Sequence, residues 1–214
     1  MDLKLIIGPM FSGKTTALID DYKSLIRNHY TPDEILVINH SFDTRYSDCY
    51  IASHDNISNI KCTMENELMN ITIDSIKTKN YQVIMINEGQ FFQDIHKWIK
   101  HLISNNINIK IIICGLDADY KQEPFGEFLH IIPYCKEIVK LKAKCYKCAQ
   151  KTALLTIRTT NDAKQIVVGN DIYKPICSFC HTHYMIDYVS PTADDTADNN
   201  TADNDTVDNT ADND

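Results

Sequence analysis

The residues best suited to chemistry in this chain are Gly8-Pro9-Met10-Phe11-Ser12-Gly13-Lys14-Thr15. Two glycines five positions apart, followed by lysine and threonine, form the Walker A pattern of a phosphate-binding loop. The glycines permit a turn that directs backbone N–H groups at phosphate oxygens, and a helix beginning here adds a favourable dipole. Lys14 would contact the β- and γ-phosphates and Thr15 would bind Mg²⁺. The pattern predicts a nucleotide site; an ordinary strand-to-helix turn is the alternative.

A second set of chemical groups follows the apolar run 81–86, where Asn87 and Glu88 stand next to each other. At the end of such a strand, the partner of a phosphate-binding loop is usually an acidic residue that holds Mg²⁺. Asn87 would be a neutral and weaker ligand. Glu88 is the candidate base that orients and deprotonates a hydroxyl nucleophile. The alternative is that Glu88 only caps a surface turn.

Four of the eight cysteines form two C-x-x-C pairs, Cys145 with Cys148 and Cys177 with Cys180. Four thiolates suit a closed tetrahedral Zn²⁺ site, which is structural because no coordination position stays open. A redox-active dithiol and unrelated buried cysteines are the alternatives. His181 and His183 could also serve as ligands, although four thiolates already suffice.

Two loops offer further candidates. The segment 115–126 follows an apolar run, and its Leu116, Tyr120 and Phe125 could line a flat slot for a base. Ordinary core packing is the alternative for these three side chains. The stretch 43–46 reads Asp-Thr-Arg-Tyr and offers an arginine able to contact phosphates, although a lone arginine is more often a solvated surface group.

The elements that must position these groups alternate along the chain. Apolar runs predict buried strands at 3–7, 34–39, 81–86 and 108–114. Helical spacing predicts helices at 15–29, 64–79 and 94–104, the last capped by Asp94, and 40–59 is predicted to be a loop. Such alternation indicates an α/β fold with a parallel sheet. Ligands of these sheets bind at the carboxyl ends of the strands, so the candidate residues should converge there.

The net charge of −8 belongs to one end of the chain. The segment 191–214 contains eight Asp and no Lys, Arg or Glu, and the rest carries 21 basic and 21 acidic residues. A neutral body argues against nucleic-acid binding. The chain shows neither a membrane-spanning apolar run nor a signal peptide, so no membrane partner is expected and the cysteines are assigned to a reducing cytoplasm.

Three units are predicted along the chain. Residues 1–142 form a nucleotide-binding domain, and residues 143–190 form a zinc-binding domain around the cysteine pairs. Residues 191–214 form a disordered acidic tail, because repeats of Thr-Ala-Asp-Asn cannot bury enough apolar surface to order themselves.

Taken together, these residues resemble the type II (thymidine kinase 1-like) thymidine kinases between residues 3 and 188. The blocks that carry the resemblance are GPMFSGKT at 8–15, DTRY at 43–46, EGQFF at 88–92, Pro124-Phe125-Gly126 and the two cysteine pairs. The resemblance implies a P-loop (RecA-like) sheet flanked by helices and a small zinc-binding lasso domain. It implies transfer of the γ-phosphate of ATP to the 5′-hydroxyl of thymidine, giving dTMP. It also implies a homotetramer that the end product dTTP inhibits at the active site.

The resemblance also assigns roles to residues. Glu88 would be the general base, and Thr15 the Mg²⁺ ligand. The ATP site would comprise Gly8, Pro9, Met10, Phe11, Ser12, Gly13, Lys14, Thr15, Asp43, Thr44, Arg45, Asn87, Gly89 and Gln90. The thymidine site would comprise Met10, Leu116, Tyr120, Phe125 and the lasso residues Gln165, Ile166, Val167, Val168, Gly169 and Tyr173.

Three features depart from the family pattern. Asn87 stands where Asp is usual, and we expect Asn87→Asp to keep or raise activity and to lower the Mg²⁺ requirement. Tyr120 stands where Phe is usual, and its hydroxyl needs a partner. One extra residue between Cys148 and Arg158 shifts the register in which Arg158 would face a phosphate. The remaining alternatives are a kinase of another nucleoside, with deoxyuridine the expected secondary substrate, and an ATP-regulated nucleic-acid-binding module.

Overall fold

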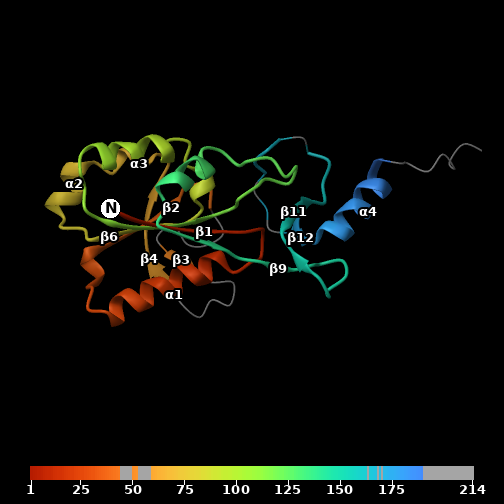
Figure 1. Ribbon diagram of the computed structural model, residues 1–214, viewed down its shortest axis with the longest axis horizontal. Helices are drawn as coiled ribbons and strands as arrows, with labels where there is room; N and C mark the ends of the chain where they lie inside the picture. Colours follow the sequence, from red (N-terminus) through yellow and green to blue (C-terminus); the bar gives the residue numbers. More distant parts are fainter. Residues whose placement is uncertain (44–49, 53–58, 163, 168, 170, 190–214) are drawn as a thin grey trace, which may run out of the picture.

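The computed structural model describes residues 1–43, 50–52, 59–162, 164–167, 169 and 171–189. Its centre is a six-stranded sheet with the order β5-β2-β6-β7-β1-β8, in which every neighbouring pair is parallel. Among these strands, Figure 1 labels β1, β2 and β6. The strands are β1 (Asp2–Ile7), β2 (Ile35–His40), β5 (Thr63–Glu65), β6 (Val83–Ile86), β7 (Lys110–Gly115) and β8 (Glu137–Lys140). The parallel α/β fold expected from the sequence is confirmed.

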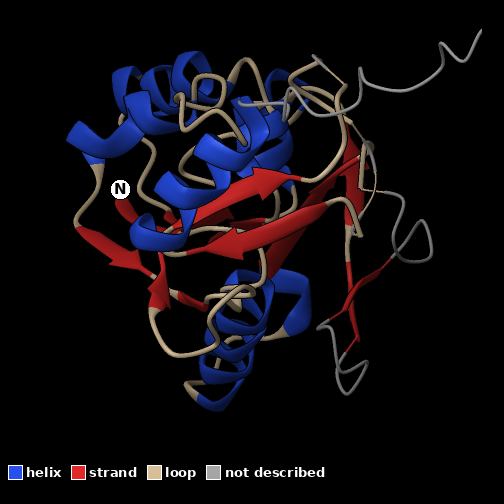
Figure 2. Ribbon diagram, turned by 90° about the vertical axis from the view of Figure 1, so that its right-hand side faces the viewer, coloured by secondary structure: helices blue, strands red, loops and turns tan. Residues whose placement is uncertain are grey.

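Both faces of this sheet are buried. Alternate residues of one strand belong to different cores: Ile111 and Ile113 of β7 pack on one face, and Ile112 and Cys114 pack on the other. The first face is covered by α2 (Ile73–Thr78), α3 (Ile95–Ser104) and the 3₁₀ helix η4 (Phe128–Tyr134), and the second by α1 (Lys14–Arg27). Figure 2 shows helices on both sides of the sheet. Burial on both faces explains why the strands are continuous apolar runs.

The segment 64–79 is not the single helix that its composition predicted. It contains strand β5, the 3₁₀ helix η2 (Leu68–Asn70) and only the short helix α2. Strand β5 pairs with β2, and the side chain of Thr72 caps α2 by accepting a hydrogen bond from the backbone N–H of Ser75 at 3.1 Å. Pairing across the sheet and this internal cap therefore override the weak helical pattern.

Two other local predictions are wrong. The segment 40–59 is not only loop, because β2 extends to His40 and the strands β3 (Tyr50–Ala52) and β4 (Asn59–Lys61) pair as an antiparallel ladder. Asp94 precedes α3, but its side chain makes no hydrogen bond to that helix. It instead accepts one from the backbone N–H of Met69 at 2.8 Å and so ties α3 to η2. The 3₁₀ helix η1 (Pro32–Glu34) leads into β2.

The cysteine-containing segment has its own small architecture beyond the sheet edge (Figure 1). Its strands are β9 (Ala143–Lys144), β10 (Thr152–Ala153), β11 (Leu155–Arg158) and β12 (Tyr173–Ile176), and they pair as two antiparallel ladders followed by α4 (Ser178–Val189). A separate cluster of buried apolar residues and cysteines lies among them. The acidic tail, Thr44, Arg45 and Val168 lie outside the described residues.

Candidate active site

The loop between β1 and α1 has the conformation of a phosphate cradle. A Cβ on Gly8 would lie 2.7 Å from the carbonyl oxygen of Leu141, so this glycine is required by space. Gly13 has nothing within 4 Å of a Cβ, but its φ of +83° is left-handed, so this glycine is required by conformation. Phe11 also has a left-handed φ, of 59°. Such strain in a non-glycine residue costs about 1–3 kcal/mol and clusters at ligand sites.

Two polar side chains of the loop suit a bound phosphate. The ammonium of Lys14 is buried and donates a hydrogen bond to the carbonyl oxygen of Pro9 at 2.7 Å, so its charge lies over the loop. The hydroxyl oxygen of Ser12 is buried and has no hydrogen-bond partner among the described residues. A phosphate oxygen would satisfy this hydroxyl and compensate the lysine charge, so the loop fits the nucleotide expected there.

Asn87 is fully buried at the carboxyl end of β6 and lies in a chain of polar contacts. Its Oδ1 accepts hydrogen bonds from the hydroxyl of Thr15 at 3.3 Å and from the thiol of Cys114 at 3.1 Å. Its Nδ2 donates to Oδ1 of Asn39 at 2.9 Å, and Nδ2 of Asn39 donates to a carboxylate oxygen of Asp43 at 3.2 Å. This chain of hydrogen bonds leads to the carboxylate of Asp43, two amide side chains away from Thr15.

Asn39 was not identified by sequence reasoning. It is a buried polar residue near the end of β2, 2% exposed, and its side chain bonds to Asn87, directly after β6, and to Asp43, in the loop after β2. The signal available in the sequence was a single amide directly after the apolar run 35–38. That signal does not tell which distant residue the amide meets.

Glu88 occupies the turn after β6 with a left-handed φ of 54° and is 8% exposed. Its Oε2 accepts a hydrogen bond from Nε2 of Gln90 at 2.6 Å, and Oε1 of Gln90 accepts one from the backbone N–H of Leu116 at 2.9 Å. Gln90 is fully buried, so it fixes the Glu88 carboxylate against the loop that follows β7. A strained backbone and a directed carboxylate are typical of a functional position.

The glycines beside Glu88 allow close packing. A Cβ on Gly89 would lie 2.8 Å from the ring of Phe128, and a Cβ on Gly115 would lie 2.8 Å from the same ring. The ring of this η4 residue therefore fills the space between the ends of β6 and β7. Gly89 was predicted to contact ATP, and the structure gives it a packing position next to the base candidate.

One cavity joins the predicted substrate residues, with an empty volume of about 670 Å³ that includes open solvent at its mouth. Every described residue predicted to contact thymidine lines it: Met10, Leu116, Tyr120, Phe125, Gln165, Ile166, Val167, Gly169 and Tyr173. Glu88, Asp43 and Gln90 also line it. The cavity thus combines apolar and aromatic walls with a carboxylate, which is the usual character of a site for a small organic substrate.

Sequence reasoning missed part of the aromatic wall. Phe42 and Phe91 also line the cavity, and Phe91 contacts Phe42 and Phe125 edge-on, with ring centroids 5.9 and 5.6 Å apart. Phe91 belongs to the EGQFF block, which was an available signal. Burial lowers the pKa of His40 behind this wall, and its Nδ1 accepts a hydrogen bond from the backbone N–H of Phe42 at 3.0 Å. Burial and this hydrogen bond both favour the neutral form of the imidazole, which lies against the aromatic wall.

Arg158 holds the far wall of the cavity together. Its guanidinium nitrogens donate hydrogen bonds to the carbonyl oxygens of Asp162, Lys164 and Gln165 and to the hydroxyl of Tyr173. The guanidinium carbon lies 3.8 Å from the ring centroid of Tyr120. Both terminal nitrogens of this buried arginine are thus engaged within the segment 158–173.

Further contacts join this wall to the loops that follow β1 and β7. Nε2 of Gln165 donates to a carboxylate oxygen of Asp119 at 2.9 Å, and the hydroxyl of Thr156 accepts a hydrogen bond from the backbone N–H of Met10 at 3.0 Å. The sequence left the hydrogen-bond partner of the Tyr120 hydroxyl unidentified, and in the structure this hydroxyl donates to the carbonyl oxygen of Asp162 at 3.4 Å. The cysteine-containing segment and the sheet therefore form the cavity together.

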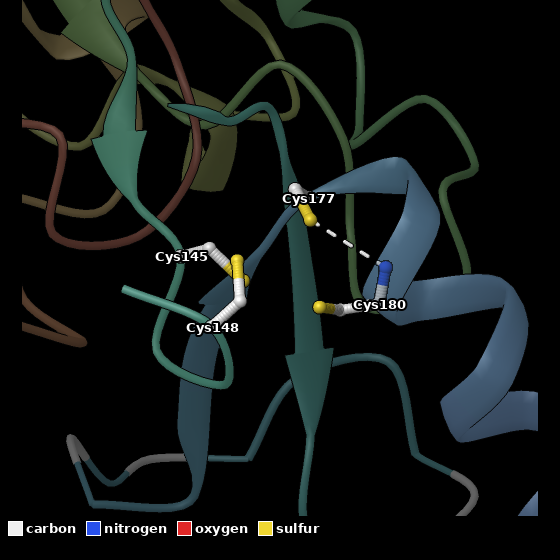
Figure 3. Close-up of side chains that lie close together, drawn as sticks. All are labelled: Cys145, Cys148, Cys177 and Cys180. Atoms are coloured by element: carbon white, nitrogen blue, oxygen red, sulfur yellow. Dashed lines mark hydrogen bonds between the residues drawn. The ribbon is translucent and has the colours of Figure 1, made fainter. Parts of the chain in front are cut away.

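The four cysteines of the two C-x-x-C pairs converge (Figure 3). Their sulfur atoms all lie within 4.8 Å of one another, and three of the four residues are buried. Burial raises the pKa of the Cys145 thiol, but backbone N–H groups of Cys148, Cys177 and Lys147 outweigh this and lower it to about 6. The backbone N–H of Cys180 donates to the sulfur of Cys177 at 3.4 Å. Four converging sulfurs fit a tetrahedral Zn²⁺ ion.

Comparisons with known proteins agree with this site. Residues 1–181 match the family model described as thymidine kinase. The chain belongs to the thymidine kinase family. A thymidine kinase of rice (Oryza sativa subsp. japonica) is 33% identical over 188 residues, covering 86% of this chain and 66% of the rice protein. The thymidine kinase of Raccoon poxvirus is 34% identical over 179 residues, covering 84% of this chain and 96% of the viral protein.

Relatives of this kind come from distant organisms. The thymidine kinase of Mycoplasma mobile is 34% identical over 184 residues, covering 84% of this chain and 86% of the bacterial protein. Family membership indicates an ATP-dependent kinase of thymidine. Across the described part of the chain, no helix has both the length and the apolar character needed to span a bilayer.

Proposed function

We propose that the cavity binds thymidine and that Glu88 accepts the proton of its 5′-hydroxyl while this oxygen attacks the γ-phosphate of ATP, giving dTMP and ADP. The observation that carries the proposal is that one cavity holds both aromatic walls and the Glu88 carboxylate, beside the phosphate loop. A base would lie among Met10, Leu116 and Phe125. The hydrogen bond from Gln90 keeps the Glu88 carboxylate aimed at the acceptor.

On the donor side, the backbone of 8–15 and the ammonium of Lys14 would hold the triphosphate. The hydroxyl of Ser12, which has no hydrogen-bond partner among the described residues, would be a further donor. Mg²⁺ would be bound by the hydroxyl of Thr15. The neutral amide oxygen of Asn87 lies 3.3 Å from this hydroxyl. Asp43 would not contact the ion directly; it would orient Asn87 through the hydrogen bonds of Asn39. Contacts of Thr44, Arg45, Gly89 and Gln90 with ATP remain predictions.

The wall formed by Gln165, Ile166, Val167, Gly169 and Tyr173 would act, together with Val168, as the lasso that reads the thymine. Zn²⁺ bound by Cys145, Cys148, Cys177 and Cys180 would be structural, because it leaves no open ligand position. We place the domain boundary at 142/143 and regard 191–214 as a disordered tail. By resemblance, we further infer a cytoplasmic homotetramer that dTTP inhibits, without nucleic-acid or membrane partners.

The test of the base is Glu88→Gln, because a glutamine carbonyl can still accept the hydrogen bond from Gln90 while the proton acceptor is lost. We expect kcat to fall by about 10²–10⁴-fold with little change in KM. Glu67→Gln is the matched control, since Glu67 is exposed and lies before η2. Turnover of Glu88→Gln within a few-fold of the wild type would exclude general-base catalysis by Glu88.

The test of the substrate offers ATP and Mg²⁺ with thymidine, deoxyuridine, deoxycytidine, deoxyadenosine and deoxyguanosine in parallel. Thymidine should have the highest kcat/KM and deoxyuridine the next. Efficient phosphorylation of a purine nucleoside would overturn the substrate assignment while leaving the role of Glu88 intact.

A further inference from the structure

A second group of metal-ligating side chains lies outside the cysteine site and the cavity. His96 comes from the first turn of α3, Glu127 directly precedes η4, and His130 lies within η4. One ligand atom from each of the three lies within 4.8 Å of the other two. The Nδ1 atoms of His130 and His96 lie 2.7 and 3.8 Å from the same Glu127 oxygen. Three ligand side chains from two elements thus share one small volume.

We propose that His96, Glu127 and His130 form a binding site for a divalent transition-metal ion, of which Zn²⁺ is the probe used below. Metal–ligand bonds of about 2.0–2.2 Å place tetrahedral donors roughly 3.3–3.6 Å apart. The observed spacings of 2.7 and 3.8 Å bracket this range, and the ligand atoms of the two histidines lie within 4.8 Å of each other. The three side chains are 31%, 42% and 59% exposed, in the order given, which leaves an entry path.

The donor set also selects the kind of ion. Two imidazoles and one carboxylate are the ligands of Zn²⁺, Ni²⁺, Co²⁺ and Cu²⁺, whereas Mg²⁺ and Ca²⁺ prefer oxygen ligands alone. Water would complete the coordination of an ion held by three side chains. The ring centroid of Tyr134 lies 6.0 Å from that of His96, so an aromatic ring lies next to one of the three ligands.

A metal ion here would join α3 to η4. The ring of Phe128 in η4 packs against Gly89 and Gly115, at the ends of β6 and β7. The ion would therefore stabilise the packing behind the cavity without contacting the substrate. This inference does not depend on the proposed reaction, because it concerns only these three residues.

The experiment measures zinc stoichiometry and affinity on the full chain with its cysteine site saturated. Equilibrium dialysis against buffered Zn²⁺ should give two ions per wild-type chain and one in His96→Gln and in His130→Gln. His101→Gln, an exposed position on the same helix α3, should keep two. A free Zn²⁺ concentration tenfold above the dissociation constant should raise Tm of the wild type by about 3–6 °C relative to the single-ion form.

Two measurements show that a variant is folded: it still binds one Zn²⁺ at the cysteine site, and its kcat for thymidine equals that of the wild type. We expect both in all three histidine variants. If His130→Gln is poorly folded, Glu127→Gln replaces it, and the second ion should bind at least about tenfold more weakly. One ion in the wild type, or a second ion that survives both histidine substitutions at unchanged affinity, would overturn the proposal.

Discussion

Arg158 allows the sharpest test of how the cavity is built, through the substitution Arg158→Met. The change removes the charge and the hydrogen bonds to three backbone carbonyls and to Tyr173, but nearly keeps the side-chain length. It also removes the stacking on Tyr120. The ordering of 158–173 should therefore weaken while the P-loop domain remains intact.

The size of the effect follows from these contacts. Hydrogen bonds of a charged donor contribute about 1.5–3 kcal/mol each, and they are not additive when one group makes them all. The cation–π contact adds about 1–2 kcal/mol. One contribution is unfavourable. Nε of Arg158 is buried with no hydrogen-bond partner among the described residues, and this desolvation costs about 1–3 kcal/mol of stability. We take about 2–3 kcal/mol as the net loss, equivalent to about 30–150-fold in an equilibrium constant.

Steady-state kinetics separate the two roles open to this arginine. If Arg158 orders the wall, KM for thymidine should rise by about 30–150-fold in Arg158→Met, while KM for ATP stays within about twofold. The KM of Arg158→Lys for thymidine should lie between those of the wild type and Arg158→Met, because one ammonium cannot reproduce the hydrogen bonds that both guanidinium nitrogens make. Arg27→Met, at the exposed end of α1, is the control. A rise in KM for ATP instead of thymidine would refute the reasoning and indicate a phosphate contact.

Two further predictions concern metal ions. Asn87→Asp should lower the Mg²⁺ concentration needed for half-maximal activity, because a carboxylate binds Mg²⁺ more strongly than an amide oxygen does. The side-chain amide of Asn39 must then turn so that it donates a hydrogen bond to the new carboxylate. A Mg²⁺ titration of activity measures the effect, and a severe loss of kcat would contradict the prediction. Removing Zn²⁺ with a chelator should abolish thymidine binding while nucleotide still binds to the P-loop domain, because the cysteine segment supplies one cavity wall. Calorimetric titration of the metal-free protein with thymidine and with nucleotide measures the two affinities separately. Retained affinity for thymidine in the metal-free protein would exclude a structural role of Zn²⁺ in forming the cavity wall.

The parts of this protein that local sequence determines are those whose physical cause is local. Gly13 is needed for a left-handed turn at the start of α1, and the apolar runs of β1, β6 and β7 follow from burial on both faces of a parallel sheet. The carboxyl ends of parallel strands meet at one edge of the sheet, which predicts that Glu88 and the 115–126 loop lie together. The cysteine pairs likewise carry their chemistry in their spacing.

Only the tertiary structure decided the contacts between residues far apart in the chain. Asn39 meets Asn87 across 48 positions because β2 and β6 are neighbours in the sheet, and nothing in either local segment encodes that pairing. Strand β5 forms where a helix was predicted, because the edge of β2 offers backbone hydrogen bonds that a short Asn- and Thr-rich helix cannot match. Arg158 binds carbonyl groups of its own segment because that loop folds back over it. Local spacing thus determined which groups could do chemistry, and long-range packing determined which partners they have.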